Sequence, residues 1–179
     1  MTNPSSLWLF AYGSLLWDPG FEPAESVRAR LDGYRRSFCL WSFHYRGTEQ
    51  RPGLVLALDA EEGVCCEGLA LRPRPEQAER VLAEVRGREL VSDAYVERRV
   101  ALHLEDGRAV EGLAFVVRRG HRQHACVDLE TQARTIADAS GERGPNLEYL
   151  ANTAAELRRI GLPDPEIEAL LSRAQAMAG

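Results

Sequence analysis

Short hydrophobic runs dominate the first two-thirds of the chain, and their spacing predicts strands. The first run covers residues 8–12, and a second covers residues 34–45. The second run has apolar residues at both odd and even positions, which is typical of a strand buried on both faces. Two more runs, 54–60 and 65–72, are separated by the triplet Glu-Glu-Gly, which we interpret as a hairpin-like break.

A hairpin is predicted where two strand-like segments lie on either side of a short polar turn. The segments are "YVERRVALHL" and "AVEGLAFVV", and the turn between them is "EDGR". The pair Asp106-Gly107 within that turn is a strong hairpin signal, because glycine adopts the positive φ that tight hairpin turns require.

Apolar spacing of three and four residues predicts four helices. Pro75 begins the first, since proline suits the first helical position. Asp128 and Asn146 are expected to cap two later helices, the second of which ends at Gly161, and Asp164-Pro165 begins the last. The helical residues expected to face inward are Ala78, Val81, Leu82, Val85, Leu129, Ala133, Ile136, Ala137, Leu150, Ala154 and Leu157.

These elements predict an α+β fold, in which a small mixed β-barrel or strongly curved sheet is surrounded by helices. The length of 179 residues suits one domain with a substantial core, and no linker or repeat interrupts it. We therefore expect a single domain over residues 1–179.

Composition narrows the classes of function. The formal net charge is −5, so the chain lacks the basic surface that nucleic-acid binding requires. No apolar run is long enough to span a bilayer, and the N-terminus lacks the features of a signal peptide. We predict a cytoplasmic protein with neither a nucleic-acid nor a membrane partner. The four cysteines (Cys39, Cys65, Cys66 and Cys126) are expected to be reduced, packed thiols.

A carboxylate falls on the core-facing side of the first predicted helix. Its apolar stripe, continued four residues beyond Val85, arrives at Glu89. Burial raises the pKa of a carboxyl group, and a glutamate with a raised pKa is suited to moving protons near neutral pH. The alternative is that Gly87 ends the helix and leaves Glu89 solvated or paired with Arg88. Periodicity by itself favours this alternative.

Other candidate residues carry weaker signals. Ser14 lacks the sequence pattern of a nucleophile elbow and is read as a turn serine. Three arginines, Arg35, Arg36 and Arg46, can bind an acidic substrate, although most arginines are solvated. The potential metal ligands are His121, His124, Cys126 and the Cys65-Cys66 pair. Their spacing does not match a paired zinc motif, so we predict no metal site.

Five segments, in order along nearly the whole chain, resemble the ChaC-like gamma-glutamylcyclotransferases. "FAYGSLLW" is similar to the family's "FGYGSLIW" signature, and "GYRRSFCLWSFHYRGTEQRPGLVLAL" to a second family segment. The other three are "CCEGLALRPRP", "GRELVSDAY" and "ASGERGPNLEYL". The chain departs from the family at two places. His44-Tyr45 replaces Asp-His before an Arg-Gly pair, and Ala94 replaces glycine before Tyr95.

The resemblance implies an enzyme that releases 5-oxoproline from glutathione and leaves Cys-Gly. It assigns proton transfer to Glu89 and substrate binding to Tyr12, Gly13, Ser14 and Leu15, with Tyr95 and Tyr149 as further contacts. The substrate's own α-amine attacks its γ-carbonyl, so no cofactor, metal or enzyme nucleophile is implied. The expected partner is therefore a small-molecule substrate.

Three alternatives stay open at this point. The substrate can be another gamma-glutamyl peptide or amine, since the change at His44-Tyr45 weakens the inference of strict glutathione selectivity. The chain can also be a non-catalytic module that binds a gamma-glutamyl ligand, although a binding module needs no inward carboxylate. A hydrolase would need a nucleophile or a positioned water, and the sequence offers no residue pattern for either.

Overall fold

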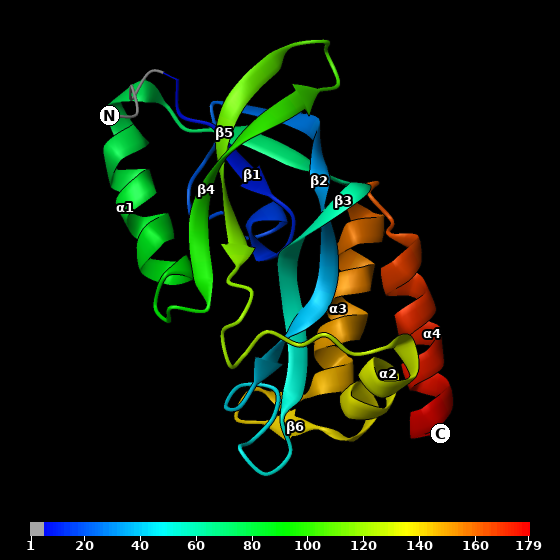
Figure 1. Cartoon of the computed structure of the whole chain (residues 1–179). Helices are drawn as coiled ribbons and strands as arrows, with labels where there is room; N and C mark the ends of the chain where they lie inside the picture. The colour runs from blue at the N-terminus through cyan, green and yellow to red at the C-terminus, as the bar shows by residue number, and fades with distance from the viewer. Residues whose placement is uncertain (1–5) are drawn as a thin grey trace. The chain divides into compact units, whose positions relative to one another are not determined.

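The strands of the computed structural model, which describes residues 6–179, close into a five-stranded barrel in the order β1-β3-β2-β4-β5. The barrel is labelled in Figure 1. Its strands are β1 (Leu9–Ala11), β2 (Glu25–Ser42), β3 (Gly53–Arg72), β4 (Tyr95–Leu104) and β5 (Ala109–Val117). The predicted fold class, a small β-barrel with surrounding helices, is confirmed.

The helices follow the barrel strands or connect them. The short 3-10 turns are η2 (Ser14–Leu16) and η3 (Pro75–Gln77), and the α-helices are α1 (Ala78–Glu89), α2 (Leu129–Asp138), α3 (Asn146–Arg159) and α4 (Pro165–Ala178). Two short strands, β6 (Ser140–Gly141) and β7 (Gly144–Pro145), pair between α2 and α3. No helix within residues 6–179 combines the length and apolar character needed to cross a membrane.

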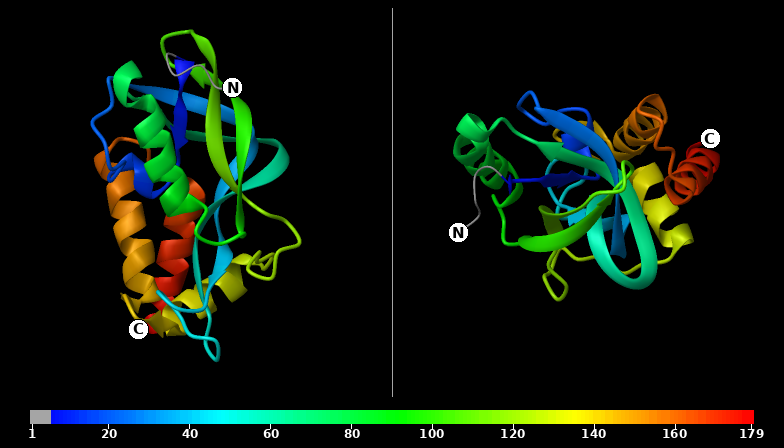
Figure 2. Two further views of the ribbon diagram at one scale, coloured as in Figure 1. Left: turned by 90° about the vertical axis from the view of Figure 1, so that its left-hand side faces the viewer. Right: turned by 90° about the horizontal axis from the view of Figure 1, so that it is seen from above.

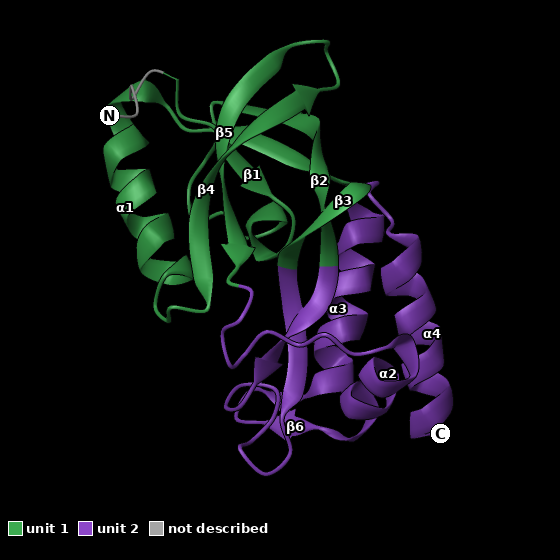
Figure 3. Cartoon of the chain, viewed as in Figure 1, with its two compact units in different colours: residues 1–36, 58–118 green, residues 37–57, 119–179 purple. Residues whose placement is uncertain are grey.

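Two compact units divide the chain, as Figure 3 shows by colour. Unit 1 comprises residues 1–36 and 58–118, and unit 2 comprises residues 37–57 and 119–179. Each unit is therefore assembled from two separate segments, and neither is a continuous domain of its own. The expectation of one domain over the whole chain stays a prediction.

The β4–β5 hairpin in unit 1 confirms the turn read from the sequence. The strands pair antiparallel from Tyr95 with Val117 to His103 with Ala109. Gly107 has a φ of +90°, which a residue with a side chain rarely adopts. The backbone conformation of this turn therefore requires a glycine at position 107.

The central strand β1 is short and completely buried, and its three residues pair with two neighbours. Leu9 lies opposite Leu71 in an antiparallel ladder and beside Leu113 in a parallel one. A Cβ atom at Gly68 would lie 2.3 Å from the carbonyl oxygen of Ala11. Only glycine allows β3 to approach the end of β1 this closely, directly before the Tyr12–Leu15 segment.

One predicted hairpin is wrong, because residues 54–72 form a single strand rather than two. The expected break at Glu61-Glu62-Gly63 lies inside β3. The Arg35 guanidinium of β2 donates to the Glu61 carboxylate at 3.0 Å, so this polar stretch pairs along the strand. Exposed charged residues within a long strand can therefore be mistaken for a turn when the sequence is read by itself.

The helices of unit 2 begin largely as predicted, with one correction. Asp128 and Asp164 accept hydrogen bonds from backbone N–H groups in the first turns of α2 and α4. Asn146 does not cap α3, because Pro145 occupies the cap position and Asn146 is the first helical residue. Its buried side chain instead bonds both backbone groups of Leu54, each at 2.8 Å. Figure 2 shows α3 and α4 side by side.

Most of the residues expected to face inward are buried, and three are not. Leu129 is exposed in the first turn of α2, whereas Leu82 and Ala137 are half-buried at the borders of their apolar stripes. All four cysteines are free thiols. Cys39 and Cys66 are packed, but Cys65 and Cys126 are exposed, so the packing prediction is wrong for those two.

Candidate active site

The Tyr12–Leu15 segment leaves the buried end of β1 and turns immediately into η2. Its turn is closed by hydrogen bonds from Leu16 N to Gly13 O at 2.8 Å and from Asp18 N to Ser14 O at 2.7 Å. Within the described residues, no acceptor is recorded for the backbone N–H groups of Gly13, Ser14 and Leu15. The first N–H groups of a helical turn have no partner within that turn.

Tyr12 holds this segment to the barrel through its side chain. The ring is buried, and its hydroxyl donates to the carbonyl oxygen of Phe115 on β5 at 2.9 Å. Ser14 is the exposed residue of the segment, whereas Gly13 and Leu15 are buried. The side chain of Tyr12 thus fixes the loop, and Ser14 is its exposed residue.

Arg36 supports the same segment from within unit 1. Its side chain is buried, and its Nε donates to the carbonyl oxygen of Tyr12 at 2.6 Å. One terminal nitrogen donates to the carbonyl oxygen of Glu67 at 2.7 Å. From the sequence, Arg36 was a candidate for binding an acidic substrate. In the structure, its guanidinium bonds the main chain of the loop.

Glu89 is the last residue of α1, so the alternative in which the helix ends at Gly87 is wrong. The helix is fixed by burial of Ala78, Val81 and Val85 along one stripe. Glu89 follows that stripe, as the spacing predicted, and its side chain is half-buried. The carboxylate forms no recorded hydrogen bond or ion pair with any residue in the described range 6–179.

Burial raises the pKa of the Glu89 carboxyl above its ordinary value, and the positive charge of the adjacent Arg88 opposes this effect. A carboxyl group with a raised pKa and no permanent partner can accept and release a proton under mild conditions. Among the predicted site residues, Glu89 therefore has the environment of an acid–base group.

Two arginines fix the end of α1 that carries Glu89. Arg86 makes a two-point contact with the Glu97 carboxylate of β4, with distances of 2.6 and 2.8 Å. Arg88 donates to the carbonyl oxygen of Asp18 at 3.0 Å, just beyond η2. The end of α1 is thereby tied to β4 and to the segment that follows the Tyr12–Leu15 loop.

The two predicted aromatic contacts belong to different units. Tyr95 is half-buried at the start of β4 in unit 1, next to the fully buried Ala94. Tyr149 lies in α3 of unit 2, where its hydroxyl accepts from Leu56 N at 3.4 Å. The rings of Phe38 and Tyr149 pack edge to face, with their centroids 5.6 Å apart. The structure therefore gathers the loop, Glu89 and Tyr95 in one unit, and describes Tyr149 in the other.

The segment in which the chain departs from the family pattern lies in unit 2. His44 pairs with the Glu142 carboxylate, and the guanidinium of Arg143 lies 4.0 Å from the centre of the Tyr45 ring. Arg46 donates to the carbonyl oxygen of Pro145 at 3.2 Å. Each residue of this segment is thus engaged with the β6–β7 hairpin or its border.

The histidine segment forms a tight turn in the structure. His124 N donates to His121 O at 3.0 Å, and the His121 Nδ1 accepts from Gln123 N at 3.2 Å.

Two arginines, Arg36 and Arg88, were not identified by the sequence as loop supports. Each bonds a main-chain carbonyl oxygen distant in the sequence, and no local pattern of residues predicts such a bond.

A raised pKa at Glu89 has a consequence for stability. The folded state favours protonated Glu89, so this residue contributes stability below its unfolded pKa of about 4.3, and the contribution is lost as the pH rises through the folded pKa. Glu89→Gln should therefore melt at a higher temperature than the native chain at pH 7–8. The difference should disappear at pH 4, as thermal unfolding at both values can measure. Equal melting temperatures at both pH values would contradict burial of this charge.

A family model described as "ChaC-like protein" matches residues 7–177. The chain is similar to the glutathione-specific gamma-glutamylcyclotransferase of Escherichia coli K12, with 36% identity over 92% of this chain and 71% of that protein. It is also similar to glutathione-specific gamma-glutamylcyclotransferase 1 of Danio rerio, with 32% identity over 96% and 89% of the two chains.

Among solved structures, the fold is similar to that of a yeast gamma-glutamyl cyclotransferase specific to glutathione. The TM-score is 0.82, at 21% identity, and the match covers 98% of this chain and the whole of the yeast chain. This likeness confirms the barrel-and-helix fold.

Proposed function

This chain belongs to the ChaC-like protein family, and on that premise we propose that Glu89 transfers the proton in a gamma-glutamylcyclotransferase reaction. The chain is an enzyme of this type, and its substrate is glutathione, which it converts into 5-oxoproline and Cys-Gly. The carboxylate of Glu89, half-buried and without a pairing partner among residues 6–179, is the observation that carries the assignment.

The reaction is an internal displacement within the substrate. The α-amine nitrogen of the gamma-glutamyl group attacks its γ-carbonyl carbon, and a five-membered lactam forms. The bond from that carbon to the cysteine nitrogen breaks, and the leaving nitrogen takes a proton. Since one proton leaves the attacking amine and one is gained by the leaving group, a single acid–base residue can balance the reaction without water.

Glu89 meets the demands of both proton transfers. An α-amine has a pKa of about 8, so most of it is protonated at neutral pH and needs a base before it can attack. A carboxylate whose pKa is raised by burial is a stronger base than an ordinary glutamate, and its protonated form then serves as the acid. Positioned proton transfer of this kind contributes about 10²–10⁴-fold to rates.

The Tyr12–Leu15 loop is the proposed substrate holder. Its backbone N–H groups at Gly13, Ser14 and Leu15 have no recorded acceptor among the described residues, so they are donors for negative charge on the substrate. During attack, negative charge develops on the γ-carbonyl oxygen, and fixed N–H donors stabilise such charge effectively. Holding the flexible gamma-glutamyl arm curled adds a proximity effect.

Tyr95 and Tyr149 are proposed as additional substrate contacts on the strength of their matching positions in the family motifs. Tyr95 adjoins the β4 contact that fixes Glu89, which supports its assignment. Tyr149 already packs against Phe38 and the Arg46 guanidinium, whose carbon lies 5.5 Å from the centre of the ring. Its hydroxyl is the group that a substrate would compete for.

Incubation with glutathione should yield 5-oxoproline and Cys-Gly in equal amounts, measured by chromatography. Production should persist in EDTA, because the proposed steps use only groups of this chain and its substrate. Gamma-glutamyl dipeptides serve as competing substrates in parallel reactions. Product from the dipeptides and none from glutathione would overturn the substrate assignment, and no product from either would overturn the enzyme assignment.

A further inference from the structure

Arg36 is a buried charged residue that bonds directly to the proposed substrate loop. It lies in β2 with 4% of its surface exposed, so it is poorly placed to meet a substrate directly. Two of its acceptors are main-chain carbonyl oxygens, one of Tyr12 at 2.6 Å and one of Glu67 at 2.7 Å. A single guanidinium therefore joins the loop to β3 by two short hydrogen bonds.

The bond to Tyr12 determines the direction of the next N–H group. Peptide bonds in the described chain are trans, so the C=O of Tyr12 and the N–H of Gly13 point in opposite directions across one planar unit. Because the carbonyl points to Arg36 inside the fold, the Gly13 N–H points away from Arg36. That N–H is one of the three loop donors with no recorded acceptor in residues 6–179.

We propose that Arg36 is a positioning residue that orients and polarises the Tyr12–Gly13 peptide so that the Gly13 N–H stabilises the oxyanion formed on the γ-carbonyl. The inference rests on the proposed function and deepens it. Arg36 acts through the loop and does not touch the substrate. A positive charge on the carbonyl side draws electron density from the amide, which makes its N–H a stronger donor.

The contacts of Arg36 depend on its charge and its donors. Burying a guanidinium is costly unless its N–H groups are bonded, and an apolar residue here would remove the partner of the Tyr12 and Glu67 carbonyl oxygens. A neutral residue would also leave the Tyr12 carbonyl without its charge-assisted bond, which is roughly twice as strong as a neutral one. A role in which the charge itself matters therefore fits the observed contacts better than a role in packing.

The test is Arg36→Lys, which keeps the positive charge but loses the planar, two-armed geometry. We expect kcat for 5-oxoproline release to fall by about 10–100-fold, because one oxyanion donor contributes about 10²–10³-fold and is weakened rather than removed. KM should change by less than about threefold, since the proposed contact strengthens in the transition state.

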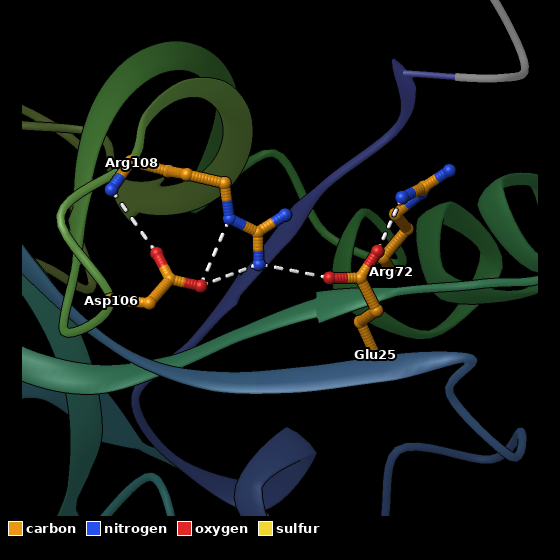
Figure 4. A network of polar contacts seen from close by, with 4 residues as sticks. All are labelled: Glu25, Arg72, Asp106 and Arg108. Atoms are coloured by element: carbon orange, nitrogen blue, oxygen red, sulfur yellow. Dashed lines mark hydrogen bonds and ion pairs between the residues drawn. The ribbon is translucent and has the colours of Figure 1, made fainter.

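Arg72→Lys is the matched control. Arg72 is a half-buried β3 arginine that bonds Glu25 and lies over the Trp8 ring, in the network with Asp106 and Arg108 shown in Figure 4. It lies by the Leu9 end of β1, whereas the loop begins beyond the Ala11 end. This variant should lose comparable thermal stability and keep the native kcat.

The second measurement does not depend on activity. The amide proton of Gly13, assigned by NMR, should shift upfield in Arg36→Lys and stay in place in Arg72→Lys. A native kcat in a folded Arg36→Lys variant, or a Gly13 amide that does not move, would overturn the proposal. If the native chain made no 5-oxoproline, the proposed function would fail, whereas a Gly13 shift would still support the polarised peptide.

Discussion

Glu89→Gln is expected to lower kcat for release of 5-oxoproline by about 10²–10⁴-fold, the range that positioned acid–base groups contribute. Glutamine has nearly the same shape, but it can neither accept the proton of the α-amine nor pass one to the leaving nitrogen. The side chain is half-buried and has no hydrogen bond or ion pair within the described residues, so its replacement by glutamine breaks no polar contact there.

Glu84→Gln provides the control on the same helix. Glu84 is exposed and pairs with Arg80 at 2.8 Å, four residues earlier along α1. Its replacement removes the same charge from the same helix while leaving the carboxylate of Glu89 in place. Its kcat should therefore match the native value. A Glu89→Gln variant that folds and turns over within threefold of the native rate would refute the assignment of proton transfer.

Asn146→Ala is expected to lower the free energy of unfolding by about 2–6 kcal/mol. Asn146 is fully buried, and its side chain satisfies both the N–H and the C=O of Leu54, each at 2.8 Å. Alanine would leave a buried donor and a buried acceptor unpaired, and each costs about 1–3 kcal/mol. Since domains are stable by only about 5–15 kcal/mol, this single change would weaken the fold severely. Urea unfolding measures the loss.

Two further variants isolate the cause. Asn146→Asp keeps the shape and one acceptor but loses the donor to Leu54 O, so it should be destabilised as well. Asn152→Ala changes an exposed asparagine of the same helix and should alter the unfolding free energy by no more than about 0.5 kcal/mol. An Asn146→Ala variant as stable as Asn152→Ala would show that the Leu54 bonds contribute little.

The sequence predicted the elements whose signals are local. The Asp106-Gly107 turn, the caps at Asp128 and Asp164 and the buried stripe of α1 depend on near neighbours in the chain. The inward position of Glu89 follows from the same stripe. Periodicity by itself favoured a solvated Glu89, because spacing cannot show that the helix continues past Gly87.

The parts that sequence reasoning missed depend on partners far along the chain. Asn146 resembles a helix cap, but its bonds to Leu54 join residues 92 positions apart. The break expected at Gly63 is absent because β3 continues through it, although the glycine has a φ of +82°, and Glu61 just before it pairs with Arg35 on β2. Arg36 reaches Tyr12 across 24 positions, and no spacing rule marks an arginine that bonds carbonyl groups.

Because the segments of the two units alternate along the chain, recombination within the gene cannot separate the units cleanly. The chain crosses between them after residues 36, 57 and 118, and the first two crossings fall inside β2 and β3. A genetic exchange with one breakpoint inside the chain therefore leaves at least one unit built from both parents. Unit 1 also cannot close during synthesis before residue 118 has left the ribosome. No single breakpoint can therefore exchange one unit whole and leave the other whole.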